Sequence, residues 1–219
     1  MTIDRAGLPF VAGALLPAAA VAVLLRPGWA LPFVALAGFF AFFFRDPDRD
    51  IPNDRDIVVS PADGRVVHAG RPEVDVAPPG QWMQISIFLS PLDVHVNRTP
   101  VSGRVLDVAY FPGRFLPAYR PEAAAENERS EISIDHDGQT IVCRQVVGLL
   151  ARRVVCRLTP GMDVTQGQRL GIMKFGSRMD VFLPMGSAIK ATVGQTVRGG
   201  QTIIAELMPV TVATKADTD

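Results

Sequence analysis

Two long apolar runs near the N-terminus constrain this chain more than any other feature. Every residue from Leu8 to Leu25 is apolar or small, and the same holds from Trp29 to Phe44. A Pro-Gly turn separates the runs, and the charged stretch RDPDRD follows the second one. A helix that is apolar all round needs a large protein core or lipid around it. We therefore predict that residues 1–50 form a hydrophobic helical hairpin.

The length of each run sets how this hairpin can meet a bilayer. A full span needs about 20 apolar residues, and each run is slightly shorter than that. The hairpin either spans with local thinning or dips into one leaflet. A secretory signal fits poorly, because the positively charged start is weak and a second apolar run follows at once. Arginines flank all three ends, so their distribution does not choose an orientation.

Composition narrows the function classes for the rest of the chain. The formal net charge is zero, which gives no argument for a nucleic-acid partner. The two cysteines, Cys143 and Cys156, have no neighbouring Cys or His at metal-ligand spacing. We interpret both as buried thiols of a reduced, cytoplasmic domain and expect no metal site.

The residue pattern of positions 51–219 predicts a mainly β domain. Short runs rich in Val, Ile and Leu alternate with Gly and Pro, as in IVV, GRVVHAG and QWMQISIFL. A sustained helical period is absent except for a short stretch at residues 120–128. Many short strands with frequent turns favour a barrel-like or sandwich-like fold over a parallel α/β sheet.

A faint internal repeat supports this fold class. GMDVTQGQRLGIM begins at Gly161, and GQTVRGGQTIIAEL begins at Gly194. Each copy predicts a turn, an inward Val, a second Gly turn and a strand. The arrangement resembles the pseudo-symmetric hairpins of biotinyl and lipoyl carrier domains. The aligned positions are Gly161, Val164, Gly167 and Gln168 with Gly194, Val197, Gly200 and Gln201.

Two motifs in the first half carry candidate site residues. SPADGRV places Asp63 in a turn, where Pro, Asp and Gly are also preferred for purely structural reasons. SPLDVHVNRTPVSG places His95 on the polar face of a strand that ends at NRTP, so its imidazole could lie at the edge of a cleft. His68, in an ordinary strand, and His136, in a turn-like DHDG, are expected to be solvated instead.

The pair Gly176-Ser177, in KFGSRMDVFLP, raises the possibility of self-cleavage. Glycine lacks a Cβ that would block attack on its carbonyl and can adopt strained backbone angles. A serine hydroxyl becomes an effective nucleophile only when a base takes its proton and a third group orients that base. Of the few histidines, His95 is the best placed base, and Asp63 is the candidate third group.

SPADG, VHVNRTPVSG, NERSE and KFGSRMDVF occur in this order after the apolar hairpin. In this combination the chain resembles the phosphatidylserine decarboxylase proenzymes, in their short form, from about Arg45 to Leu207. The resemblance implies a carboxy-lyase that makes phosphatidylethanolamine by a pyruvoyl Schiff-base mechanism. It also implies residence at the cell membrane, with phosphatidylserine as substrate, and it leaves a homodimer open.

The same resemblance implies roles for the candidate residues. Asp63, His95 and Ser177 would form a triad in which Ser177 attacks the carbonyl of Gly176. Cleavage there would leave a β chain, residues 1–176, and an α chain, residues 177–219, with a pyruvoyl group derived from Ser177. This chain departs from the family pattern at two places: many relatives have Leu-Gly-Ser-Thr at the cleavage site, and many have a second His where Leu92 stands here.

Three alternatives stay open on sequence grounds. IMKF resembles the Met-Lys-Met turn of biotin carriers, which would make Lys174 the modified residue. A pyruvoyl enzyme could instead decarboxylate a soluble amino acid, although such an enzyme has no use for the apolar hairpin. An inactive membrane scaffold is the third alternative, but it would not need Asp63, His95 and Ser177 together.

Overall fold

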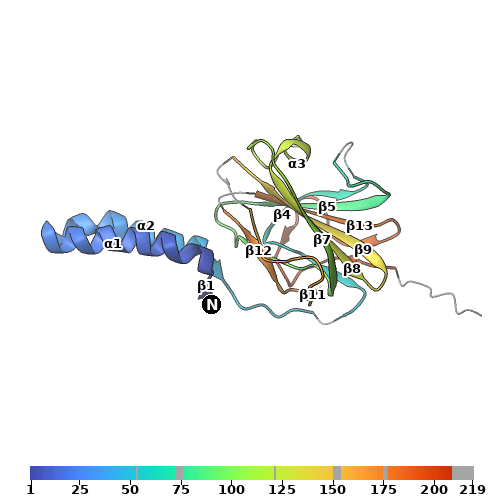
Figure 1. Ribbon diagram of the computed structural model, residues 1–219, viewed down its shortest axis with the longest axis horizontal. Helices are drawn as coiled ribbons and strands as arrows, with labels where there is room; N and C mark the ends of the chain where they lie inside the picture. Colours follow the sequence, from blue (N-terminus) through green and yellow to red (C-terminus); the bar gives the residue numbers. More distant parts are fainter. Residues whose placement is uncertain (53, 73–75, 121, 150–153, 175–176, 209–219) are drawn as a thin grey trace, which may run out of the picture.

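The computed structural model describes residues 1–52, 54–72, 76–120, 122–149, 154–174 and 177–208. Two helices lie side by side and project from one end of a β-rich body (Figure 1). They are α1 (Leu8–Leu24) and α2 (Leu31–Phe43), joined by the 3-10 turn η2 (Pro27–Ala30). A further 3-10 turn, η1 (Arg5–Gly7), leads into α1. The expected helical pair is confirmed.

The ends of the helical pair are tied together by a two-stranded sheet. Strand β1 (Thr2–Ile3) pairs with β2 (Arg45–Asp46), and the amide of Asp4 donates to the carbonyl of Phe44 at 2.8 Å. A Cβ on Gly7 would lie 2.4 Å from the Cβ of Phe44. The residues just before α1 and just after α2 therefore pack closely together at the base of the helical pair, next to the β body.

The centre of the β body is an antiparallel sheet of eight strands in the order β11-β7-β8-β9-β13-β5-β4-β15. The bounds of its strands are β4 (Gly64–Gly70), β5 (Trp82–Leu89), β7 (Gly103–Phe111), β8 (Arg129–His136), β9 (Gln139–Val147), β11 (Asp163–Val164), β13 (Ser177–Pro184) and β15 (Thr196–Val197). Alternate residues of these strands, such as Ile85, Ile87, Val181 and Leu183, form the main apolar core.

Two three-stranded sheets cover this core. One has the order β10-β12-β6, from β10 (Val154–Cys156), β12 (Arg169–Met173) and β6 (Val96–Arg98). The other has the order β14-β16-β3, from β14 (Ala188–Ile189), β16 (Ile203–Glu206) and β3 (Ile57–Val59). A short helix, α3 (Ala123–Glu126), interrupts the connection from β7 to β8. The protein is mainly β, as expected, and its sheets are open.

The predicted repeat occupies equivalent places in the fold. Each copy gives a two-residue strand at one edge of the large sheet, β11 or β15, and then a strand of a small sheet, β12 or β16. The amide of Gly161 donates to Val105, and that of Gly194 donates to Val66, both at 2.8 Å. All four glycines of the repeat have φ between +74° and +91°, in the left-handed region that favours glycine.

The hydrogen bonds of this repeat reveal a second internal repeat in the chain. Gly167 donates to Thr99 and Gly200 donates to Ser60, again at 2.8 Å each. The two acceptors begin matching segments, TPVSGRV and SPADGRV, which sequence analysis did not align. In this alignment Asp63 corresponds to Ser102. The fold therefore has an internal pseudo-symmetry, and the segments that carry the candidate site residues are part of it.

Candidate active site

Ser177 is the first residue of β13, the strand that lies between β5 and β9. It pairs with Leu89 on one side and Val147 on the other. Its side chain is fully buried, and its Oγ has no hydrogen-bond partner within the part of the chain that the structure describes. A buried hydroxyl normally has a partner. Gly176, the residue before it, lies outside the described residues.

His95 lies at the end of the loop that follows β5 and leads into β6. The amide of Ser90 donates to Asp93 Oδ2 at 2.7 Å, and His95 Nδ1 lies 2.9 Å from the carbonyl oxygen of Asp93. A carbonyl can only accept, so Nδ1 carries the proton and Nε2 is the basic nitrogen. Burial is the main cause that lowers the pKa of His95 to about 4. The imidazole is therefore neutral at neutral pH.

Two backbone links place His95 and Ser177 at the same end of the sheet. The carbonyl of His95 accepts from the amide of Met173 at 3.3 Å, and Met173 ends the strand that precedes Ser177. Leu89 pairs with Ser177 and begins the loop that carries His95. Ser177 is therefore linked to the segment that carries His95 in two ways: through β12, which precedes Ser177, and through β5, which pairs with it.

The helical pair forms one wall of the histidine site. The rings of Phe43, the last residue of α2, and His95 have centroids 4.1 Å apart. Phe43 and Phe44 are fully buried and pack with Val94, Val96 and Ile172. The pair of helices therefore excludes water from His95 as well as projecting away from the body.

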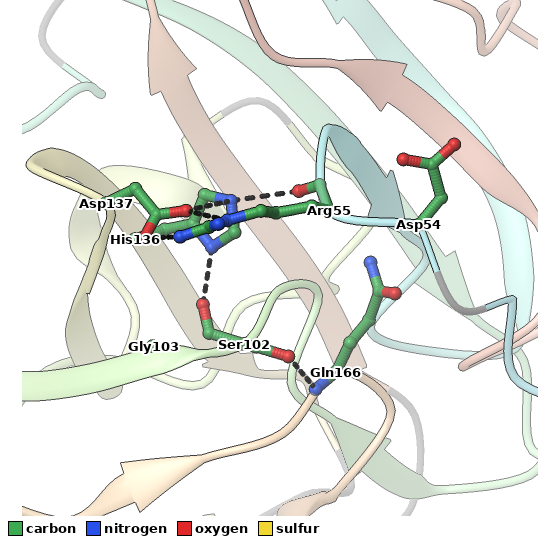
Figure 2. Close-up of a pocket in the computed structure, with 7 residues that line it drawn as sticks. All are labelled: Asp54, Arg55, Ser102, Gly103, His136, Asp137 and Gln166. Atoms are coloured by element: carbon green, nitrogen blue, oxygen red, sulfur yellow. Dashed lines mark hydrogen bonds and ion pairs between the residues drawn. The ribbon is translucent and has the colours of Figure 1, made fainter. Parts of the chain in front are cut away.

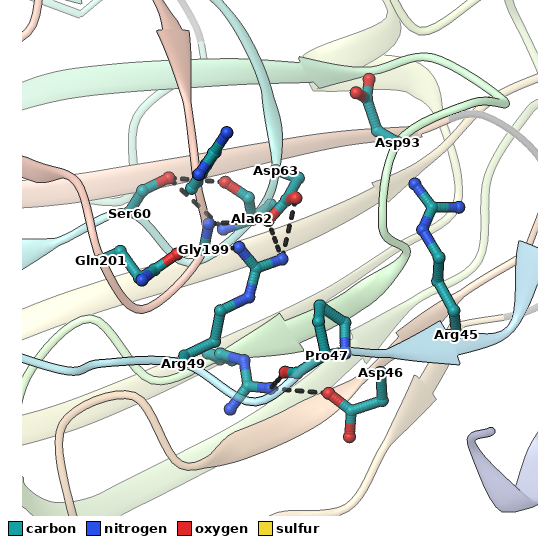
Figure 3. Close-up of polar contacts among 12 residues, drawn as sticks. Arg45, Asp46, Pro47, Arg49, Ser60, Ala62, Asp63, Asp93, Gly199 and Gln201 are labelled. Atoms are coloured by element: carbon teal, nitrogen blue, oxygen red, sulfur yellow. Dashed lines mark hydrogen bonds and ion pairs between the residues drawn. The ribbon is translucent and has the colours of Figure 1, made fainter. Parts of the chain in front are cut away.

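Asp63 has different partners from those that the triad hypothesis expects. Both of its carboxylate oxygens accept from Arg49 Nη2 at 2.9 Å, and Oδ1 also accepts from the amide of Gly199 at 2.8 Å (Figure 3). Ser102, its pseudo-symmetric counterpart, accepts in the same way from the amide of Gln166 at 2.9 Å. Part of the role of Asp63 is therefore to cap a turn. None of the hydrogen bonds and ion pairs described for Asp63 reaches His95.

Arg45, in β2, interacts electrostatically with both Asp63 and His95. Its guanidinium donates to the carbonyls of Phe42 and Leu92 at 2.8 and 2.7 Å. Its charge is attracted to Asp63 and Asp93 and contributes to the lowered pKa of His95, after burial. The side chain of Leu92, which stands where many relatives have a second His, is 69% exposed. Sequence analysis did not single out Arg45 and Arg49 as site residues. Both stand in the charged stretch RDPDRD, which gave no other indication of their contacts.

A pocket of about 450 Å³ lies elsewhere, around His136 (Figure 2). The expectation that His136 is solvated is wrong: it is buried, and its two ring nitrogens lie 2.6 and 3.0 Å from the carbonyls of Ser102 and Arg55. Arg55 also pairs with Asp137. These groups satisfy one another and tie the start of β3 to the sheet, so the pocket is structural. His68 is half-buried and lies 2.7 Å from the carbonyl of Arg71.

The described residues also bear on a metal site, on the two thiols and on the carrier lysine of the sequence analysis. Among the described residues, no group of three His, Cys, Asp or Glu side chains could hold a metal ion. Cys143 is buried, and Cys156 is half-buried; both are free thiols. Lys174 is half-buried with its ammonium 4.9 Å from the ring centre of Phe10, unlike a carrier lysine at an exposed hairpin tip.

The fold and these contacts define a class of protein: a mainly β body with a buried serine and a buried histidine at one end of its sheet, and with an apolar helical pair packed beside the histidine. A family model described as phosphatidylserine decarboxylase matches residues 36–205. The chain belongs to this family.

Curated relatives match over nearly their whole length. A phosphatidylserine decarboxylase proenzyme of Nitrosomonas europaea is 43% identical over 205 residues, which cover 93% of this chain and 94% of the relative. Proenzymes of the same name from Aromatoleum aromaticum and Solibacter usitatus are 44% and 43% identical, over 94% of this chain and 95% and 97% of theirs.

Proposed function

We propose that this chain is a carboxy-lyase that converts phosphatidylserine into phosphatidylethanolamine after cutting itself before Ser177. Membership of the family supports the overall reaction. The observation that carries the proposal is the fully buried Ser177 Oγ, which has no hydrogen-bond partner among the described residues and lies at the same end of the sheet as a buried, neutral His95. A structural serine at this position would be expected to make a hydrogen bond.

Self-cleavage needs only groups of this chain and water. Ser177 Oγ attacks the carbonyl carbon of Gly176 and gives its proton to His95 Nε2. The peptide C–N bond then breaks, the nitrogen takes the proton, and an ester remains. Loss of the Cα proton breaks the Cβ–Oγ bond and releases residues 1–176 with a carboxylate end. The enamine at position 177 tautomerises, and water releases ammonia to leave a ketone.

The pyruvoyl group made in this way would supply an electron sink for decarboxylation. The site fits it, because a chain end at residue 177 would lie enclosed between β5 and β9, away from bulk water. His95 is the residue proposed to hold and return the proton in this second reaction, and no second His stands at position 92 to share that role.

We keep Asp63 as the third residue of the proposed triad, acting through its negative charge. Its carboxylate attracts the charge of Arg45, and the charge of Arg45 in turn helps burial to lower the pKa of His95. Asp63→Asn tests this role, because the amide oxygen can still cap Gly199 while the charge is lost. Slower cleavage would support an electrostatic role, whereas cleavage at the wild-type rate would leave Asp63 with the turn cap alone.

We further propose that residues 1–50 hold the β domain, residues 51–219, on the cytoplasmic face of the cell membrane. One helical stretch, Arg5–Leu24, is long and apolar enough to cross a membrane, which by itself is weak evidence. A lipid substrate requires the site to lie at the interface, and α2 ends at Phe43, whose ring packs against His95. Labelling of introduced surface cysteines in intact cells tests the orientation, and sedimentation in detergent tests whether two copies of the chain form a homodimer.

Intact-mass measurement of the purified protein tests the main proposal. We expect two chains, 1–176 and 177–219, the second with a pyruvoyl end that resists Edman degradation, and carbon dioxide release from phosphatidylserine but not from free serine. Ser177→Ala should stay full length and inactive. An unbroken, fully active wild-type chain would overturn the proposal, and activity on serine would favour the soluble-substrate alternative.

A further inference from the structure

Two fully buried amide side chains lie near the serine–histidine site. Asn97 is on β6 and Gln145 is on β9, and Gln145 Nε2 donates to Asn97 Oδ1 at 2.9 Å. Within the described residues, Asn97 Nδ2 and Gln145 Oε1 have no hydrogen-bond partner. Buried amide groups with unused donors and acceptors are rare and need an explanation.

Strand register places this amide pair next to Ser177. Gln145 lies opposite Met179 across the β9–β13 pair, and Ser177 is two residues along β13 on the same face. Such diagonal neighbours have Cα atoms about 7–8 Å apart, which long side chains can bridge. On the other side, Asn97 is the middle residue of β6, and His95 stands two residues before it, directly ahead of that strand.

Packing alone does not account for the pair. The same face of β9 and β13 continues with Cys143, Ile141, Val181 and Leu183, which are all buried in the main core. Apolar side chains in place of Asn97 and Gln145 would extend that core without leaving polar atoms unpaired. Among the described residues of this face, the polar atoms without a hydrogen-bond partner lie where the face reaches Ser177, whose Oγ is one of them.

We propose that Asn97 Nδ2 donates to the carbonyl oxygen of residue 176 when Ser177 attacks it, and that Gln145 is the positioning residue that fixes the amide of Asn97. This inference rests on the proposed self-cleavage. As the Oγ–C bond forms, the carbonyl electrons move to oxygen, and the proton passes to His95. A preorganised donor aimed at this oxygen stabilises the charge that develops there.

The hydrogen bond between the amides sets the direction of this donor. Because Gln145 Nε2 donates to Oδ1 of Asn97, the oxygen of Asn97 turns toward β9 and its NH₂ group turns away. Gln145→Glu has the same shape but offers only acceptors. Asn97 would then reverse to donate to the carboxylate, and its oxygen would face the site where a donor is required.

Pulse–chase synthesis of the full-length chain with liposomes measures the rate of self-cleavage. Removing one such donor slows other acyl transfers by roughly 10²–10³-fold, and we expect Asn97→Ala to slow cleavage on that order. Gln145→Glu should slow it comparably. The double variant Asn97→Ala/Gln145→Ala should be no slower than Asn97→Ala, because Gln145 acts through Asn97.

Hydroxylamine separates this role from a later one. It cleaves an accumulated ester, so a variant blocked at elimination would be cut by it, whereas Asn97→Ala should not be cut because the ester forms too slowly. Gln84→Met is a matched control: Gln84 is a fully buried amide on β5 that donates to Ser86. This control should cleave at nearly the wild-type rate.

The outcomes distinguish this inference from the function on which it rests. A wild-type chain that does not cleave would overturn the proposed function. A wild-type chain that cleaves, together with Asn97→Ala cleaving at the same rate, would overturn only the inference. If protease resistance shows that Asn97→Ala is misfolded, the isosteric Gln145→Glu decides the question in the same assay, and normal cleavage there overturns the inference.

Discussion

The base and the tip of the helical pair have similar apolar composition but opposite surroundings. At the base, Phe43 and Phe44 are fully buried against the β body. At the tip, Val23 is 82% exposed, Leu24 78% and Trp29 69%. The base is therefore part of the protein core and of the candidate site, while the tip presents an exposed apolar surface, as membrane or protein contact sites do.

Charges at the base strengthen this difference. Asp46 Oδ1 lies 2.6 Å from Arg98 Nη2, and its other oxygen pairs with Arg169. Asp4 Oδ1 lies 2.6 Å from Arg157 Nη2. Both aspartates are buried, and both belong to the segments that flank the helices. Ion pairs and aromatic packing together fix the base on the small sheet β10-β12-β6.

Among substitutions at the base of the helical pair, Asp46→Ala is expected to cause the largest loss of folding stability. It leaves the guanidinium of Arg98, whose side chain is only 9% exposed, without its carboxylate. Breaking one side of a buried ion pair typically costs about 3–5 kcal/mol. Chemical denaturation in detergent, in a Ser177→Ala background, measures the loss. Asp48→Ala is the matched control: its carboxylate is exposed, so no measurable change is expected.

Phe43→Ala should have a similar or slightly smaller effect on stability and a distinct effect on the site. Removing a buried Phe typically costs about 3–5 kcal/mol, less if water or neighbours fill the space. Water admitted beside His95 should also raise the pKa of its imidazole toward the ordinary value, which histidine NMR would detect. Phe39→Ala, at a ring that is 42% exposed, should do neither. An unchanged His95 pKa in Phe43→Ala would contradict the wall that we describe.

The next largest effect is expected from a fall in pH, which should lower the folding stability through His95, at the base of the helical pair. The pKa of His95 is about 4 in the folded protein because of burial, against 6.5 when unfolded. Below pH 6.5 the unfolded chain binds a proton that the folded chain does not, so stability is lost as pH falls from 6.5 to 4. The loss is at most about 3 kcal/mol. His95→Gln should flatten the stability–pH curve in this window; an unchanged slope would contradict the assignment.

The smallest effect is expected from a single methyl group. A Cβ on Gly7 would meet Phe44 at 2.4 Å, whereas one on Gly28, in the turn at the tip, would meet nothing within 4 Å. Overpacking at Gly7→Ala should cost about 1–3 kcal/mol. Gly28→Ala should leave the melting temperature in detergent unchanged. Equal effects of the two substitutions would mean that base and tip do not differ in packing.

The sequence predicts the pattern of elements better than the contacts between them. Apolar runs, β-branched residues and paired glycines depend on local periodicity, so the helical pair, the β body and the repeat at Gly161 and Gly194 could be predicted. The pairing of Asp63 with Arg49 joins a turn to the linker and has no local signal. The same holds for Phe43 against His95 and for the enclosure of His136 by two carbonyls.

The candidate site was predictable for a related reason. Gly176-Ser177 and His95 stand in short motifs that carry chemistry by themselves, so residue type pointed to them. Asn97 and Gln145 are ordinary amides in strands, and only the register between β9 and β13 brings them to the same place as Ser177. Long-range pairing of strands is the information that one sequence without relatives does not contain.

The position of β13 has a consequence for the life of the cut protein. Eight residues of this strand pair with β5 and six with β9. Further along, β15 forms one edge of the large sheet, and β14 and β16 belong to the small sheet β14-β16-β3. A break ahead of Ser177 would nick the molecule without releasing either piece. Once such a nicked protein unfolds, however, its two fragments diffuse apart. Refolding would then require the fragments to find each other and would depend on their concentration, so the mature protein would unfold irreversibly at low concentration.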